Sequence, residues 1–97
     1  MTTYIATFSN GTTKKIANSV RIYSHAWCVA WHRIGVSGTV YRRCEAGFAR
    51  SQTLAERSRD SCISRALKRL AYAMSDDLPA GTGATLDFSE VVAVRTP

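Results

Sequence analysis

The feature that most constrains this fold is an amphipathic stretch in the second half of the chain, EAGFARSQTLAERSRDSCISRALKRLAYAMSDD. Ser51 is a good N-cap, and Glu56 lies near the expected helix start, where a carboxylate suits the positive end of the helix dipole. At about 100° per residue, apolar side chains gather on one face, which holds Cys62, Ile63, Ala66, Leu67, Leu70, Ala73 and Met74. The opposite face holds Arg57, Arg65, Lys68 and Tyr72. We predict one long helix with an apolar side for a sheet and a cationic side for water or a partner.

The N-terminal segment, TYIATFSNGTTKKIANS, has the pattern of a β-hairpin. Asn10-Gly11 suits a type I′ turn, in which both central residues need positive φ. The residues before it alternate as strand residues do, with Tyr4, Ala6 and Phe8 on one face and Ile5 and Thr7 on the other. We predict strands near Tyr4–Phe8 and Thr13–Ala17.

The stretch YSHAWCVAWHR, residues 23–33, is compatible with two structures. As a strand it places Trp27, Val29 and Trp31 on one face and Ala26, Cys28, Ala30 and His32 on the other. As a helix capped by Ser24 it forms an apolar stripe of Ala26, Trp27, Ala30 and Trp31. The strand is favoured because GVSG follows at once and TVYRR then reads as a return strand, which predicts a second hairpin of Trp27–Ile34 and Thr39–Cys44.

The C-terminal part contains a loop and a last strand. SDDLPAGTGAT combines a proline with two glycines and breaks the helix, and FSEVVAVRT then predicts a strand over Glu90–Arg95. The expected order is β-β-β-β-α-β. We therefore predict an α+β fold, a mostly antiparallel β-sheet made of two hairpins plus a C-terminal strand, packed against one long amphipathic helix in a single domain of residues 1–97.

Charge and composition indicate the kind of partner. The net charge is +6, and residues 21–69 hold ten basic side chains against three acidic ones. Such a basic body suggests an anionic partner, either nucleic acid or an acidic protein surface. No apolar run is long enough to cross a bilayer and the N-terminus does not have the pattern of a signal peptide, so we expect a cytoplasmic protein without a membrane partner. The three cysteines should then be reduced thiols.

The residues that could carry chemistry do not form a recognisable site. His25, Cys28, His32 and Cys44 lack the spacing of a zinc site. Cys28 has histidines nearby but no well-placed orienting group, and Asp76-Asp77 lies beside a Pro-Gly loop where it should be solvated. No phosphate-binding glycine motif is present. We expect a protein that is not an enzyme and that binds neither a metal nor a cofactor.

Binding through exposed side chains is the remaining class of function. Arginines next to aromatic residues suit single-stranded nucleic acid, while Arg, Tyr and Trp also dominate protein interfaces. The candidate partner-binding residues are Arg42, Arg43, Arg57, Arg65, Lys68 and Tyr72. Pro79, in the glycine-rich loop, offers an X-Pro bond that a prolyl isomerase could engage.

Three stretches, YIATFSNGTTKK, YSHAW and GFARSQTLAER, resemble small proteins from the early regions of tailed phages. Size and charge are also similar to the accessory proteins with which lambdoid phages counter host defence, and among these to the anti-RecBCD proteins. The resemblance implies a non-enzymatic protein that binds the host RecBCD helicase-nuclease and alters its processing of DNA ends. It assigns no role to any particular residue. An anti-CRISPR protein would differ from this expectation only in its target.

Overall fold

The computed structural model describes residues 1–35, 37–73 and 84–95, together with their side chains except those of 67–73. The elements follow in the predicted order: β1 (Thr2–Thr7), β2 (Thr13–Asn18), β3 (His25–Ile34), β4 (Val40–Ala49), α1 (Gln52–Ala73) and β5 (Ala84–Ala93). All pairings between these strands are antiparallel. The predicted α+β fold of two hairpins, a C-terminal strand and one long helix is therefore confirmed.

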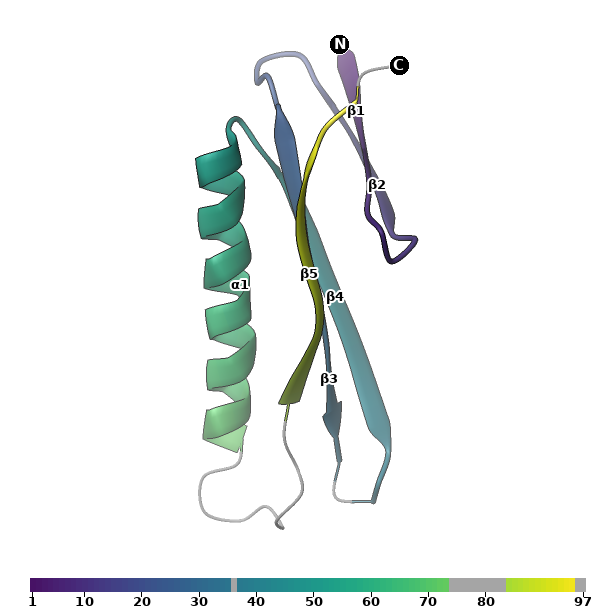
Figure 1. Cartoon of the computed structure of the whole chain (residues 1–97), viewed down its shortest axis with the longest axis vertical. Coiled ribbons are helices and arrows are strands. Elements are labelled where there is room, and N and C mark those ends of the chain that lie inside the picture. The colour runs from purple at the N-terminus through teal and green to yellow at the C-terminus, as the bar shows by residue number, and fades with distance from the viewer. Residues whose placement is uncertain (36, 74–83, 96–97) are drawn as a thin grey trace.

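The elements stack in three layers (Figure 1). The middle layer is a sheet of order β4-β3-β5, and α1 packs on one face of it, chiefly over β3 and β5. β1 and β2 form a separate hairpin that packs on the other face. Two backbone hydrogen bonds between Ile5 and Arg95 tie this hairpin to the chain just beyond β5. The central sheet therefore has one face under a helix, one partly under a hairpin, and β4 and β5 as its outer strands.

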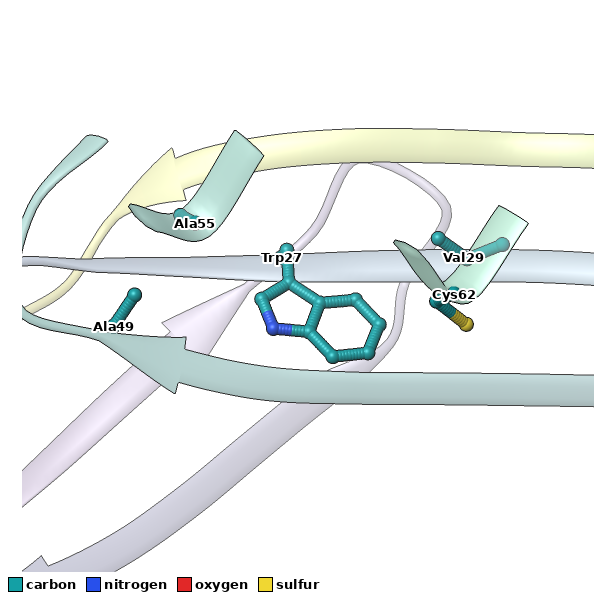
Figure 2. Packing of buried hydrophobic residues seen from close by; sticks show 5 residues of the cluster. All are labelled: Trp27, Val29, Ala49, Ala55 and Cys62. Carbon is teal, nitrogen blue, oxygen red and sulfur yellow. The ribbon is translucent and has the colours of Figure 1, made fainter. Parts of the chain in front are cut away.

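Side chains of the central strand β3 alternate between two apolar clusters. The helix-side cluster consists of Trp27, Val29, Ala49, Ala55 and Cys62 (Figure 2). The hairpin-side cluster consists of Ala6, Phe8, Ala26 and Cys28. Burial on both faces with a period of two residues is what a central strand requires. The strand interpretation of residues 24–33 is confirmed, and the alternative helix is wrong.

The first hairpin has a different turn from the predicted one. Gly11 N donates to Phe8 O at 3.0 Å, and Phe8 N donates to Thr12 O at 2.8 Å. Gly11 has a φ of 90°. Ser9 and Asn10 are thus the central residues of the turn, and the glycine after them takes the left-handed conformation, which is the common three-residue hairpin loop. The second hairpin repeats these hydrogen bonds at Gly35, Gly38 and Thr39.

The strand β4 is longer than predicted, since it runs past Cys44 to Ala49. Glycine is a poor strand former, so the local sequence does not favour a strand that continues through Gly47. In the structure Gly47 pairs directly with Trp27, whose indole extends from β3 toward β4 (Figure 2). A Cβ on Gly47 would lie 2.8 Å from Trp27 Nε1. The absence of a side chain is therefore what allows the tryptophan to lie flat against this strand.

The last strand is also displaced from its predicted bounds. β5 covers Ala84–Ala93, whereas the sequence predicted Glu90–Arg95. The register slips between Ala30 and Trp31 of β3, which leaves Asp87 as an extra, bulged residue of β5. A bulge breaks the alternation of residues along a strand, so the pattern before residue 90 did not look like a strand. The other predicted strand bounds lie within two residues of the observed ones.

Replacing Ser51 with alanine should destabilise the fold by about 1 kcal/mol. The backbone N–H of Leu54 donates to Ser51 Oγ at 3.2 Å, which satisfies one of the free N–H groups at the helix start. Thermal or urea unfolding followed by circular dichroism measures the change. Ser64→Ala is a matched control on an exposed helix position and should be neutral or slightly stabilising. An equal loss in both variants would contradict the capping role.

Candidate interaction surface

The histidines and cysteines of β3 and β4 do not converge on one point. His25 faces the helix side of the sheet, where its Nδ1 lies 2.8 Å from Ser24 Oγ. Cys28 and His32 face the opposite side. Cys28 Sγ contacts Cys44 Sγ at 3.6 Å, across β3 and β4. No group of three or more metal-ligating side chains occurs within the part of the chain that the structure describes.

One polar pair was missed by the sequence analysis. His32 Nδ1 lies 2.7 Å from both carboxylate oxygens of Asp87, a residue 55 positions away. The β5 bulge places Asp87 beside His32, and a bulge has no signature that could have revealed this pair in the sequence. A histidine oriented by a carboxylate can act as a base toward a cysteine. Cys44 lies on the neighbouring strand, and its sulfur contacts that of Cys28.

Two of the three thiols are protected by the fold. The pKa of Cys28 is raised from its ordinary value of 9.0 to about 12, mainly by burial and in addition by the adjacent Cys44. Burial also raises the pKa of Cys62 to about 11, helped by a hydrogen bond of 3.2 Å in which Cys62 Sγ donates to Glu45 Oε2. Cys44, in contrast, is exposed. Only Cys44 therefore combines accessibility with a position at the edge of the sheet.

Iodoacetamide at neutral pH should alkylate Cys44 and leave Cys28 and Cys62 unmodified until the chain unfolds. The thiolate is the reactive species, and a raised pKa together with burial keeps the two buried groups as thiols. Intact mass spectrometry should show one adduct per native chain, and Cys44→Ser should remove it. Rapid native labelling of Cys62 would contradict this picture.

Since both pKa shifts are upward, the stability that the protonated thiols of Cys28 and Cys62 contribute should be lost as pH rises from 9.0 to about 12.

Arg42 and Arg43 are exposed on β4 but point to opposite sides of the sheet. Arg43 pairs with Trp31, which packs on the helix side, and Arg42 pairs with His32, which faces the hairpin side. Beside them, the guanidinium of Arg33 lies 4.7 Å from the centre of the Tyr41 ring. This edge of the sheet therefore carries cations on both faces.

Arg43 and Arg65 lie around a single contact between β4 and α1. Glu45 of β4 accepts the hydrogen bond of Cys62, and Arg43 lies two residues away on the same face. Arg65 is exposed and follows Cys62 by three residues. Its positive charge partly offsets the rise that burial and Glu45 cause in the pKa of the Cys62 thiol. We call this region, Arg43 and Arg65 around the Cys62–Glu45 contact, the β4–α1 seam.

The remaining candidates from the sequence are scattered or lie outside the description. Arg57 is exposed and, at about 140° around the helix from Cys62, points away from the sheet. The backbone of α1 includes Lys68 and Tyr72, but their side chains lie outside the described part of the structure. Pro79, the proposed prolyl isomerase contact, also lies outside it. Of the six predicted residues, Arg42 and Arg43 thus lie on opposite faces of β4, and Arg65 lies on α1 one helical turn beyond Cys62, which contacts β4 through Glu45.

Comparisons with known proteins add no relative. No known protein family matches the chain, and no curated protein or solved structure is detectably similar to it. Within the described residues, the helix α1 is not apolar enough to span a membrane. The site must therefore be interpreted from its own geometry.

Proposed function

We propose that this chain is a phage-encoded, non-enzymatic modulator that binds a host helicase-nuclease complex of the RecBCD type and alters its processing of DNA ends. It would act in the bacterial cytoplasm by surface contact alone. The observation that carries the proposal is the exposed set of arginines on the outer strand β4 and on the helix α1 that packs on the sheet: Arg42, Arg43 and Arg65. The resemblance of three stretches to early proteins of tailed phages gives the class of target.

The charges of these arginines support binding rather than folding as their role. The ion pairs found among the described residues are His32 with Asp87 and Arg59 with Asp60. No carboxylate lies within salt-bridge distance of Arg42, Arg43 or Arg65 in that part of the chain. Arginine is enriched in interface hot spots, where it pairs with carboxylates on the partner. An acidic patch on a host protein would match this surface.

An affinity pull-down from bacterial lysate with the full chain tests the proposal. Mass spectrometry should identify the subunits of a helicase-nuclease complex, and these should be lost with the double variant Arg43→Glu/Arg65→Glu. The control variant Lys15→Glu/Arg21→Glu makes the same charge change at exposed residues of the hairpin and the loop after it, and should retain the complex. Recovery of no nuclease complex would refute the proposal. Recovery of a CRISPR effector complex instead would identify the chain as an anti-CRISPR protein.

Direct binding of nucleic acid is the second candidate. The observation that favours it is Tyr41, which is 40% exposed and shares one face of the sheet with Arg33 and Arg43, so that a base could stack near two phosphate-binding cations. The expected signature is a steep loss of affinity with salt, with a log–log slope of roughly −0.7 to −0.9 per phosphate contacted. A gel shift that shows no complex at low salt would eliminate this candidate.

A further inference from the structure

We propose that the outer edge of β4, from Val40 to Cys44, accepts an extended acidic segment of the partner protein as a fourth strand of the central sheet. This inference rests on the proposed function for the existence of a protein partner, and it adds the mode of binding. Addition of a strand to an open edge is a common way for a folded domain to bind an extended segment. The partner's backbone would supply hydrogen bonds, and its carboxylates would meet the arginines.

The hydrogen-bond pattern of the second hairpin shows which groups on β4 are open. Gly35 N donates to Thr39 O at 2.7 Å, which makes these two residues a hydrogen-bonded pair. Because such pairs alternate along an antiparallel ladder, Arg33 with Tyr41 and Trp31 with Arg43 are also hydrogen-bonded pairs. The N–H and C=O groups of Val40, Arg42 and Cys44 therefore point away from β3, and Arg42 O accepts only a long hydrogen bond, of 3.5 Å, from Arg43 Nη1. β4 is the outermost strand, so these groups face the space beside the sheet.

The two ends of β4 differ in how far this edge is covered. Toward the C-terminal end of β4, the Nζ of Lys14 donates a hydrogen bond to Ala46 O. This outward-facing carbonyl is therefore already occupied. The β1–β2 hairpin also covers only the part of the sheet nearer the chain termini (Figure 1). Toward the β3–β4 turn, Val40 is 46% exposed and Tyr41 is 40% exposed. The segment 40–44 is thus the part of β4 that a further strand can reach.

Charge selects the occupant of this edge. Arg42 and Arg43 flank the edge from its two faces, and the segment 40–44 contains no acidic residue. Charged side chains on an edge strand normally prevent pairing with another copy of the same strand, because like charges would lie close together. The same two arginines would attract an extended segment that carries glutamate or aspartate on both faces. The other outer strand, β5, carries Asp87 and Glu90, so it does not offer this complementarity.

The direct test uses the full chain labelled with ¹⁵N and a short synthetic peptide in which glutamate alternates with valine and threonine. On binding, the amides of Arg42 and Cys44 should gain protection from hydrogen exchange, whereas the amides of Tyr41 and Arg43, already bonded to β3, should change little. A peptide with lysine in place of glutamate should not bind. Failure of the acidic peptide to bind, or protection confined to β5, would overturn the proposal. Concentration-dependent dimerisation through β4 would also overturn it, in favour of a second copy as the occupant.

Comparing a proline with a glutamine at position 42 distinguishes the contribution of backbone hydrogen bonds to peptide binding from the contribution of charge. Arg42→Pro removes an outward N–H without breaking the ladder to β3, a position where a strand tolerates proline. It should weaken peptide binding roughly tenfold more than Arg42→Gln, which keeps the N–H, since it removes a hydrogen bond and obstructs the approaching strand. Unchanged circular dichroism would show that the variant folds, and an N-methylated Cys44 amide made by chemical synthesis provides a second route. Equal binding by Arg42→Pro and Arg42→Gln would overturn the proposal.

The result can be distinguished from failure of the proposed function. If the host helicase-nuclease complex is captured equally well by Arg42→Pro and by Arg42→Gln, the mode of binding is wrong while the proposed function stands. If no such complex is captured but the acidic peptide protects Arg42 and Cys44, the edge is a strand-binding site and the identity of the partner is wrong.

Discussion

Replacing Trp27 with alanine should lower the free energy of unfolding by about 3–5 kcal/mol, a large part of the stability of a domain of this size. Trp27 is only 9% exposed and packs with Val29, Ala55 and Cys62 between the sheet and the helix. Its removal leaves a cavity that neighbouring backbone cannot easily fill. Urea unfolding monitored by far-UV circular dichroism gives the change.

Trp31→Ala is the matched control for this prediction. Trp31 lies on the same face of β3 but is only partly buried against the cluster. Its truncation should cost clearly less than that of Trp27, because less contact area is lost. Equal losses at the two positions would contradict the placement of the core at the Trp27 end of the sheet.

Replacing Gly47 with valine should destabilise the protein by about 1–3 kcal/mol through overpacking. A Cβ at this position would lie 2.8, 3.0 and 3.1 Å from three atoms of the Trp27 indole. The effect opposes strand propensity, since valine is otherwise favoured over glycine in a strand. Unfolding in urea, measured as for Trp27, tests the sign.

The double variant Trp27→Ala/Gly47→Val distinguishes a clash with the indole from a general intolerance of side chains in β4. Without the indole, the valine should cost little or should partly fill the cavity, so the two changes should be strongly non-additive. Additive losses would show that Gly47 is needed for some other reason.

The sequence predicted the order and type of elements well because local patterns determine them. The period of α1 and the alternation around Trp27 are local properties, and each agrees with the observed fold. The ends of β4 and β5 were predicted wrongly because they depend on pairing. Gly47 belongs to a strand only because Trp27 lies opposite it, and the residues before Glu90 pair with β3 across a bulge that no sequence pattern reveals.

The candidate surface also combines features that follow from the local sequence with features that depend on contacts between distant residues. Adjacent residues of a strand point to opposite faces, so the separation of Arg42 from Arg43 could have been predicted once β4 was recognised. The contact between Cys62 and Glu45 could not, because it depends on how α1 lies over β4. The pairing of His32 with Asp87 likewise requires the observed register.

The most direct test of the account is equilibrium binding of the purified chain to a purified helicase-nuclease complex, measured by fluorescence anisotropy together with degradation of linear duplex DNA. We expect saturable binding that changes the degradation pattern, weakened at least about tenfold by Arg43→Glu/Arg65→Glu because charge-paired hot spots contribute most of such an interface. Lys15→Glu/Arg21→Glu should bind as the unaltered chain does. Absence of saturable binding, or equal weakening by both double variants, would contradict the account.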